Sequence, residues 1–97
     1  MDTKAKNTYQ QMVALKAEFN AKHEGAVVLF RFGDFYEMIN DDAETTEKVL
    51  GLHVADMRRF GIEGLTHLSA FTRRALDIEL PRLIRAGYRV CIADTKD

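Results

Sequence analysis

The apolar positions along the chain alternate between helical and strand spacing, and this pattern predicts the first three elements. Helical spacing over residues 8–22 predicts an amphipathic helix. The continuous apolar run over 26–32 is rich in β-branched and aromatic residues, which predicts a strand buried on both faces. Gly33 and Asp34 interrupt the apolar pattern before it resumes over 35–39, so we expect a second strand after a hairpin or sharp bend at the glycine.

The rest of the chain continues this alternation of helices and strands. It predicts a helix over 43–50 preceded by Asp41-Asp42 and stopped by Gly51, a strand over 52–54, a polar loop over 58–63, a strand over 64–71, a helix over 78–86 stopped by Gly87, and an apolar final strand over 88–94. Pro81 would break a helix that ran from residue 72. We therefore expect Asp77 to cap the last helix and Pro81 to fall in its first turn. We expect the final strand to lie at the centre of the sheet.

These elements define the fold class. Their order, α-β-β-α-β-β-α-β, predicts an α/β fold with an α+β-like order, in which about three helices flank a mixed β-sheet. With 97 residues, 46% of them hydrophobic and 30% charged, the chain has the composition of a globular protein and room for one core. We therefore expect a single domain over 1–97, with fraying of the polar ends at 1–8 and 95–97.

The charge balance restricts the classes of partner. The chain has 14 basic and 15 acidic residues, and a net charge of -1 argues against a free-standing, high-affinity nucleic-acid binder. A local basic patch stays open, because the second half is rich in arginine: Arg58, Arg59, Arg73, Arg74, Arg82, Arg85 and Arg89. The single cysteine, Cys91, excludes an internal disulfide and is expected to be a buried, inert thiol. No secretory signal or membrane-length apolar run is present, so we expect a cytoplasmic protein without a membrane partner.

Catalytic chemistry finds little support in the residues. The chain lacks a glycine-rich phosphate loop and a nucleophile elbow around its one serine, Ser69. The histidines have no companions at metal-ligand spacing and are expected to be ordinary surface or half-buried residues: His23, His53 and His67. A nuclease-like metal site could be imagined on Asp34, Glu37, Asp41 and Asp42, but helix capping explains the last two better. We expect no enzyme activity, no metal and no cofactor.

One segment, residues 32–37, combines aromatic and acidic side chains beside the expected bend. Because side chains alternate in a strand, Phe35 and Glu37 share one face and Tyr36 points to the other. A buried, unpaired Glu37 would be costly, so we expect this face to be partly open, with Phe35 exposed near the bend and Tyr36 in the core. From the residue pattern alone, core packing of the aromatic pair, with Glu37 as a rim carboxylate, is favoured over a binding role.

The same segment carries a resemblance to a known family. The run Gly33-Asp34-Phe35-Tyr36-Glu37-Met38, preceded by the apolar strand and followed by Asp41-Asp42-Ala43, resembles the signature of the N-terminal domain of the MutS mismatch-repair proteins. Further similar stretches lie at matching spacing: Tyr9-Gln10-Gln11, Leu15-Lys16, Val49-Leu50-Gly51-Leu52 and the run 80–93. The resemblance therefore covers residues 8–95 and implies the fold of that domain.

The resemblance also implies a function in recognition of DNA mismatches or distortions. In that family the signature phenylalanine enters the minor groove and stacks on a mispaired base, while the signature glutamate hydrogen-bonds to the base. By position these residues are Phe35 and Glu37. The implied partner is mismatched duplex DNA. Because the chain has no counterpart of the family's clamp, lever and ATPase domains, protein partners supplying clamp or ATPase functions are implied as well.

Three stretches depart from the family's pattern: 55–57, 70–74 and 93–95. In the second of them, Arg73 and Arg74 could be new contacts to DNA phosphates, although a solvated charged pair is the favoured interpretation from the residues alone. The near-neutral charge and the absent clamp leave an alternative function open. This alternative is a protein-interaction or accessory module that keeps the fold but not the DNA-reading role.

Overall fold

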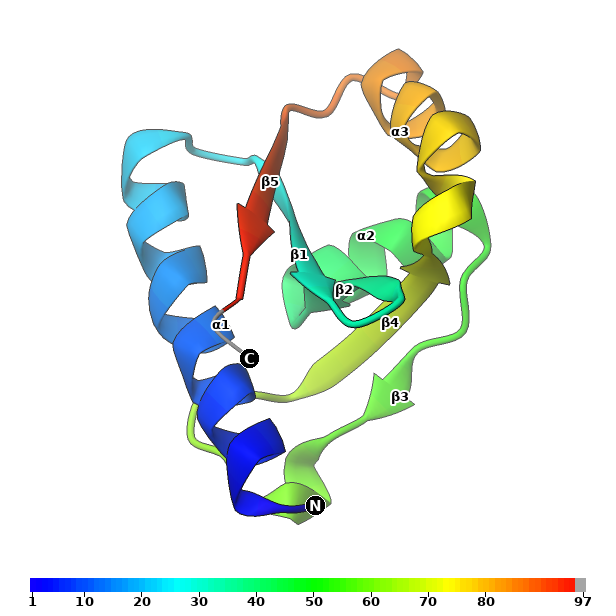
Figure 1. Cartoon of the computed structure of the whole chain (residues 1–97). Coiled ribbons are helices and arrows are strands. Elements are labelled where there is room, and N and C mark those ends of the chain that lie inside the picture. The colour runs from blue at the N-terminus through cyan, green and yellow to red at the C-terminus, as the bar shows by residue number, and fades with distance from the viewer. Residues whose placement is uncertain (96–97) are drawn as a thin grey trace.

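The computed structural model describes residues 1–95, which form a five-stranded mixed sheet with helices on both faces (Figure 1). The elements are α1 (Thr3–Lys22), β1 (Val27–Phe32), β2 (Phe35–Ile39), α2 (Asp41–Leu50), β3 (Ala55–Asp56), the 3₁₀ turn η1 (Arg58–Phe60), β4 (His67–Thr72), the 3₁₀ turn η2 (Arg73–Ala75), α3 (Leu76–Arg85) and β5 (Val90–Asp94). The predicted fold class and order of helices and strands are confirmed. Lys96 and Asp97, part of the end expected to fray, lie outside the described residues.

The strands lie in the order β3-β4-β2-β1-β5, so β2 is the central strand. β5 runs parallel to β1, whereas the other neighbouring pairs are antiparallel. The prediction that the final strand is central is therefore wrong, because β5 lies at an edge. Of its side chains only Ala93 is buried, whereas Ile92 is 40% exposed, so its apolar run does not reflect a fully buried strand.

Alternation along β1 and β2 divides the core into two layers. On the face covered by α1, side chains of β1 and β2 pack with the helix: Tyr9, Met12, Val28, Phe30 and Ile39. On the face covered by α2 and α3, the layer holds Val27, Leu29, Tyr36, Met38, Leu50 and Leu83. The four residues Val27–Phe30 are almost wholly excluded from solvent, which confirms a strand buried on both faces.

The start of the first helix and the strand expected over 52–54 differ from the sequence-based expectation. α1 begins at Thr3 rather than near residue 8, because the Asp2 carboxylate accepts a hydrogen bond from the Ala5 N–H (2.8 Å) and caps the helix. The expected strand over 52–54 is wrong, since these residues have no strand partner. The short strand β3 follows them instead and pairs with Leu68 and His67 of β4.

α3 also starts earlier than predicted. The helix begins at Leu76, directly after η2, so Asp77 lies inside the first turn instead of capping it. Pro81 consequently lies in the second turn, which corrects the expectation of a first-turn proline. The proline has no N–H to donate to the Asp77 carbonyl, but Asp77 is exposed, so water can serve that carbonyl at little cost. Among residues 1–95, no helix combines the length and apolarity that crossing a bilayer would require.

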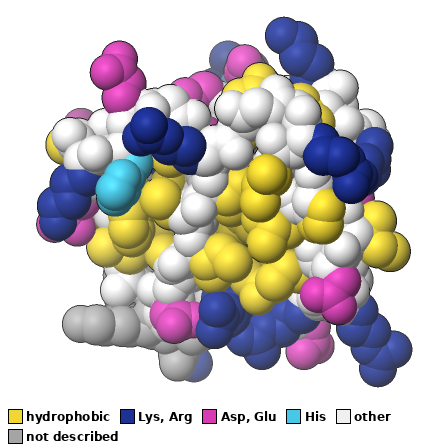
Figure 2. Space-filling model, turned by 90° about the horizontal axis from the view of Figure 1, so that it is seen from above, with side chains coloured by type: hydrophobic (Ala, Val, Ile, Leu, Met, Phe, Trp, Pro, Cys, Tyr) yellow, Lys and Arg dark blue, Asp and Glu magenta, His cyan; other side chains and the backbone are white. Residues whose placement is uncertain are grey.

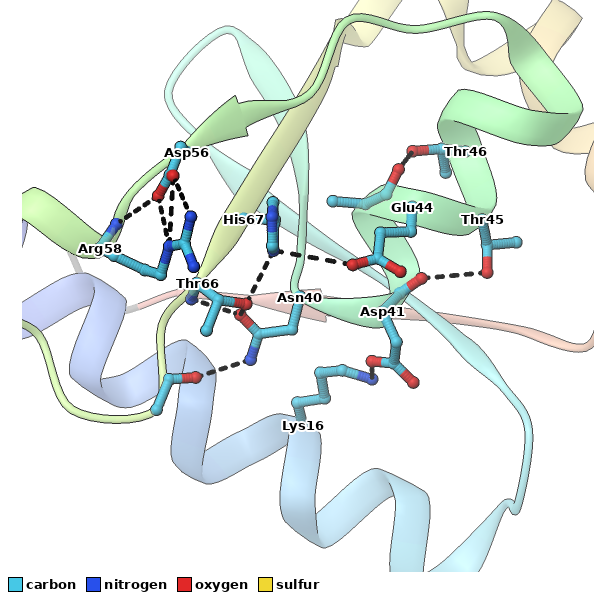
Figure 3. A network of polar contacts seen from close by, with 12 residues as sticks. Lys16, Asn40, Asp41, Glu44, Thr45, Thr46, Asp56, Arg58, Thr66 and His67 are labelled. Atoms are coloured by element: carbon cyan, nitrogen blue, oxygen red, sulfur yellow. Dashed lines mark hydrogen bonds and ion pairs between the residues drawn. The ribbon is translucent and has the colours of Figure 1, made fainter.

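Buried polar contacts fix α1 to the start of α2. The Lys16 ammonium is buried between Asp41 (2.9 Å) and Asp42 (3.1 Å), and Figure 3 shows this side chain reaching across from α1. Asp42 also accepts a hydrogen bond from the Val28 N–H of β1 (3.0 Å). One carboxylate therefore joins α1, β1 and α2, and β1 is one of the two strands that carry the aromatic segment.

Asn40 anchors the end of β2. Its backbone has φ 59°, a region that non-glycine residues rarely adopt, and hydrogen bonds of its side chain hold it there. The amide donates to the Gly64 carbonyl (2.7 Å) and its oxygen accepts from the Thr66 N–H (2.8 Å), as Figure 3 shows. β2 is thus held at its far end as well as along both edges.

Candidate functional site

The site is built around the β1–β2 hairpin. Phe32 and Phe35 are directly paired, which leaves Gly33 and Asp34 as a two-residue loop. Gly33 has φ 60°, and a glycine with positive φ at the first loop position is the pattern of a type II′ hairpin turn. The Asp34 carbonyl accepts a hydrogen bond from the Arg73 N–H (2.9 Å) at the end of β4. This bond fixes the turn to the neighbouring strand.

Phe35 is the first residue of β2, and its ring is 44% exposed. Its backbone pairs with Phe32 of β1 on one side and with Thr72 of β4 on the other. The next residue, Tyr36, is buried against the ring of Phe71 on the opposite face. The expectation of an exposed Phe35 and a core Tyr36 agrees with these positions, so a large apolar ring stands in solvent on a rigid central strand.

Glu37 is half-buried on the same face as Phe35. Its Oε1 accepts a hydrogen bond from the Tyr9 hydroxyl of α1, with an O–O distance of 2.8 Å. Burial raises the pKa of the Glu37 carboxyl above its ordinary value, and the hydrogen bond from Tyr9 offsets part of that rise. The carboxylate is therefore a held acceptor rather than a loose group at the rim.

Tyr9 contacts the candidate site through Glu37, and reasoning from the residues did not single it out. It is only 6% exposed, and its ring meets that of Phe32 edge-on, with centroids 5.8 Å apart. Burial and the neighbouring Glu37 carboxylate raise the pKa of the Tyr9 hydroxyl well above its ordinary value, so the hydroxyl stays a donor at any ordinary pH. The sequence did contain a signal for this contact: Tyr9 lies on the apolar face of the first helix, and a buried tyrosine hydroxyl usually has a hydrogen-bond partner.

Arg73 and Arg74 lie beside the hairpin turn. Both are exposed residues of η2, and with Asp34 and Thr72 they line an open hollow of about 440 Å³. Both arginines directly follow Thr72, the residue of β4 that pairs with Phe35, whereas Glu37 lies two residues further along β2. Of the four residues singled out from the sequence, Phe35, Arg73 and Arg74 thus lie at the hairpin end of the sheet, and Glu37 lies at the middle of β2.

Arg31 adds a third cation at this end and was also missed. It pairs with Tyr36 across the hairpin, and its guanidinium lies over the Tyr36 ring at 5.8 Å from the centroid. One of its nitrogens contacts Asp94 of β5 at 3.1 Å. Arg31 therefore lies on the face opposite Phe35, and its charge is partly offset by Asp94.

A stability experiment tests the environment of Glu37. The pKa of Glu37 is higher in the folded state than in the unfolded state. Its contribution to the free energy of unfolding is therefore greatest below the ordinary pKa of glutamate and falls as the pH rises through the folded-state pKa. Above the folded-state pKa the contribution no longer changes with pH. Glu37→Gln cannot ionise, and its side-chain carbonyl can still accept from Tyr9. We expect the variant to unfold at higher urea concentration than the wild type near neutral pH, with the difference shrinking below about pH 4. A difference that does not vary with pH would contradict the raised pKa.

The sequence of the chain is similar to one family of known proteins. The sequence model of the family described as MutS domain I matches residues 8–97. The DNA mismatch repair protein MutS of Parabacteroides distasonis is 44% identical over 77 residues, and that of Cytophaga hutchinsonii is 45% identical over 80 residues. The MutS of Bacteroides thetaiotaomicron is 45% identical over 78 residues. Each match covers 79% of this chain but only 9% of the relative's own length.

Proposed function

The chain belongs to the MutS domain I family, and we propose that it is a binding domain that probes duplex DNA for mispaired or distorted base pairs. The observation that supports this most directly is the exposed Phe35 on the central strand, with the anchored Glu37 carboxylate on the same face. The relatives that match are named as mismatch repair proteins, which favours a DNA role for this surface. The proposed activity is binding rather than catalysis. The proposed location is the cytoplasm, where the DNA of bacteria such as those of the matching relatives lies.

The energetics of an aromatic wedge fit a mismatch better than a paired site. Inserting an apolar side chain between base steps costs about a few kcal/mol in lost stacking. A mismatched base is less costly to displace than a paired one. Stacking of a base on an aromatic ring returns about 1–3 kcal/mol. Phe35 has the exposure and the rigid backbone that such a wedge needs, so the net balance favours distorted DNA.

Glu37 supplies the chemical selectivity in this proposal. A carboxylate is repelled by DNA phosphates, so it is useful at a DNA surface only where it accepts a hydrogen bond from a base edge. One of its oxygens already accepts from Tyr9, and within residues 1–95 the structure gives the other oxygen no partner. A mispaired base that presents an N–H to this oxygen would be preferred over one that presents only acceptors.

Arg73 and Arg74 are proposed to contact phosphates, and this gives a test by salt dependence. Replacing both by alanine is expected to weaken binding to paired and mispaired duplexes equally. The slope of log affinity against log salt should become shallower by up to about two, because each neutralised phosphate contributes about 0.9. Fluorescence anisotropy across a salt series measures the slope. The matched control is Arg85→Ala with Arg89→Ala, two exposed arginines at and after the end of α3. If both double variants change the salt slope equally, the change reflects net charge alone, and Arg73 and Arg74 have no specific contact with phosphates.

The experiment that tests the proposed function compares two duplexes that differ in one base pair. Binding of the 97-residue chain to a duplex with a central G·T pair and to the same duplex fully paired is measured by anisotropy at low salt. We expect tighter binding to the G·T duplex. Equal binding to both duplexes would remove the proposal.

Because the full-length relatives are far longer, proteins that supply clamp or ATPase functions are proposed partners, and the isolated chain is expected to bind weakly.

A second function, docking of a protein partner, is favoured by exposed apolar side chains on α3 and β5. Several large apolar side chains are exposed on α3 and β5: Ile78, Ile84 and Ile92. Figure 2 shows apolar side chains gathered in the middle of the face at the end of the molecule where α3 and the start of β5 lie, with Lys and Arg side chains around them. The test is Ile84→Asp. If this variant no longer captures the protein partner but keeps its preference for mismatched DNA, partner docking belongs to this surface and is separate from DNA binding.

A further inference from the structure

The contact between Tyr9 and Glu37 joins residues 28 positions apart in the sequence, from α1 to the central strand. The phenol is nearly excluded from solvent, and a buried hydroxyl without a partner would cost about 1–3 kcal/mol. The Glu37 carboxylate likewise lies partly buried on an apolar face. Each group thus compensates for the burial of the other, and the pair forms one unit at the site.

The two cross-strand neighbours of Glu37 offer its carboxylate no alternative side-chain donor. In the sheet it is flanked by Phe30 of β1 and Ala70 of β4, and neither side chain can hydrogen-bond. Within residues 1–95, the hydrogen bond from Tyr9 is the one that the structure gives its carboxylate. Without this bond, the side chain would have free rotation about its terminal torsions, with both oxygens seeking solvent.

We propose that Tyr9 is a positioning residue of the DNA-reading site: its hydroxyl holds one Glu37 oxygen in place and leaves the other free to accept from a base. This inference rests on the proposed function. A carboxylate fixed before DNA arrives loses less conformational entropy on binding than a mobile one. Tyr9 therefore contributes to mismatch preference although it is buried and need not touch DNA.

Tyr9→Phe tests this inference because it removes the hydroxyl and keeps the ring that packs on Phe32. The ratio of the dissociation constants for paired and G·T duplexes is expected to fall by about three- to tenfold, with affinity for the paired duplex unchanged. In the Glu37→Ala background the same substitution should have no further effect on the ratio. Tyr88→Phe is the matched control, since Tyr88 lies just before β5 beside Asp41 and Thr45 of α2.

A measurement without DNA accompanies the binding series. The Glu37 carboxyl is titrated by carbon NMR in the folded wild type and in Tyr9→Phe. Because the hydrogen bond from Tyr9 lowers the Glu37 pKa, the variant should titrate at higher pH than the wild type. An unchanged titration would show that Tyr9 does not hold the carboxylate, and would overturn the inference.

The binding outcomes separate the two proposals. A wild type without mismatch preference removes the proposed function and this inference with it. A wild type with preference that Tyr9→Phe retains overturns the positioning role alone. A preference that Tyr9→Phe lowers equally in the presence and absence of the Glu37 carboxyl means that Tyr9 acts through packing, which also overturns it. A mismatch preference that Tyr9→Phe lowers when Glu37 is present, but not in the Glu37→Ala background, supports the positioning role.

Discussion

Replacing Phe35 by alanine is expected to lower the preference for a G·T duplex over its paired counterpart by about 5- to 150-fold, the equivalent of one stacked base. The ring is 44% exposed, so its removal should change the free energy of unfolding by less than about 1 kcal/mol. Loss of function with retained stability is the combination that distinguishes a probe from a core residue. Anisotropy with both duplexes, and urea unfolding of both proteins, measure the two quantities.

The controls for this prediction separate stacking from hydrophobicity. Phe35→Leu keeps an apolar wedge without an aromatic face and should retain only part of the preference. Ile78→Ala removes an even more exposed apolar side chain from α3 and should leave the preference unchanged. If Phe35→Ala instead keeps the wild-type preference, or unfolds the chain at low urea, the ring is scaffold and the DNA-reading role falls.

Asp42→Ala is expected to have the largest effect on stability, about 3–5 kcal/mol. The substitution leaves the buried Lys16 ammonium with Asp41 alone and removes the acceptor of the Val28 N–H. Small domains have unfolding free energies of about 5–15 kcal/mol, so this change would bring the chain close to unfolding at room temperature. Urea unfolding followed by circular dichroism measures the change.

Asp41→Ala is the matched control for this prediction. Its carboxylate lies equally close to Lys16, at 2.9 Å, but is 78% exposed, so its loss should cost about 1 kcal/mol or less. The two substitutions remove the same chemical group from adjacent residues and differ mainly in burial. Equal losses would show that the ion pair, rather than the buried carboxylate, carries the stabilisation.

The hairpin that carries the site was predictable because its determinants are local. A glycine followed by an aspartate between two apolar runs specifies a two-residue loop, and strand alternation then places Phe35 and Tyr36 on opposite faces. Glu37 on the same face argued for an open surface at Phe35, and Phe35 is exposed. The residue pattern alone favoured core packing of the aromatic pair, which is wrong for Phe35 and holds only for Tyr36. Such inferences need only a few consecutive residues.

The features that escaped prediction depend on tertiary contacts. An apolar strand indicates cover on both faces but not the number of strand neighbours, so β5 was wrongly expected at the centre. The start of α3 is set by η2 and the end of β4, and Pro81 alone could not locate it. The bond between Tyr9 and Glu37 depends on how α1 lies across the sheet, which no local pattern specifies.

The central position of β2 has a mechanical consequence. A ring at the end of a flexible arm could yield when a base pair resists it, and would then touch every sequence alike. Phe35 instead begins a strand bonded on both edges and anchored beyond its far end by Asn40, so its backbone has little freedom to give way. Under the proposed function it is therefore the DNA that must deform, and the most easily deformed base steps are the ones that would admit the ring.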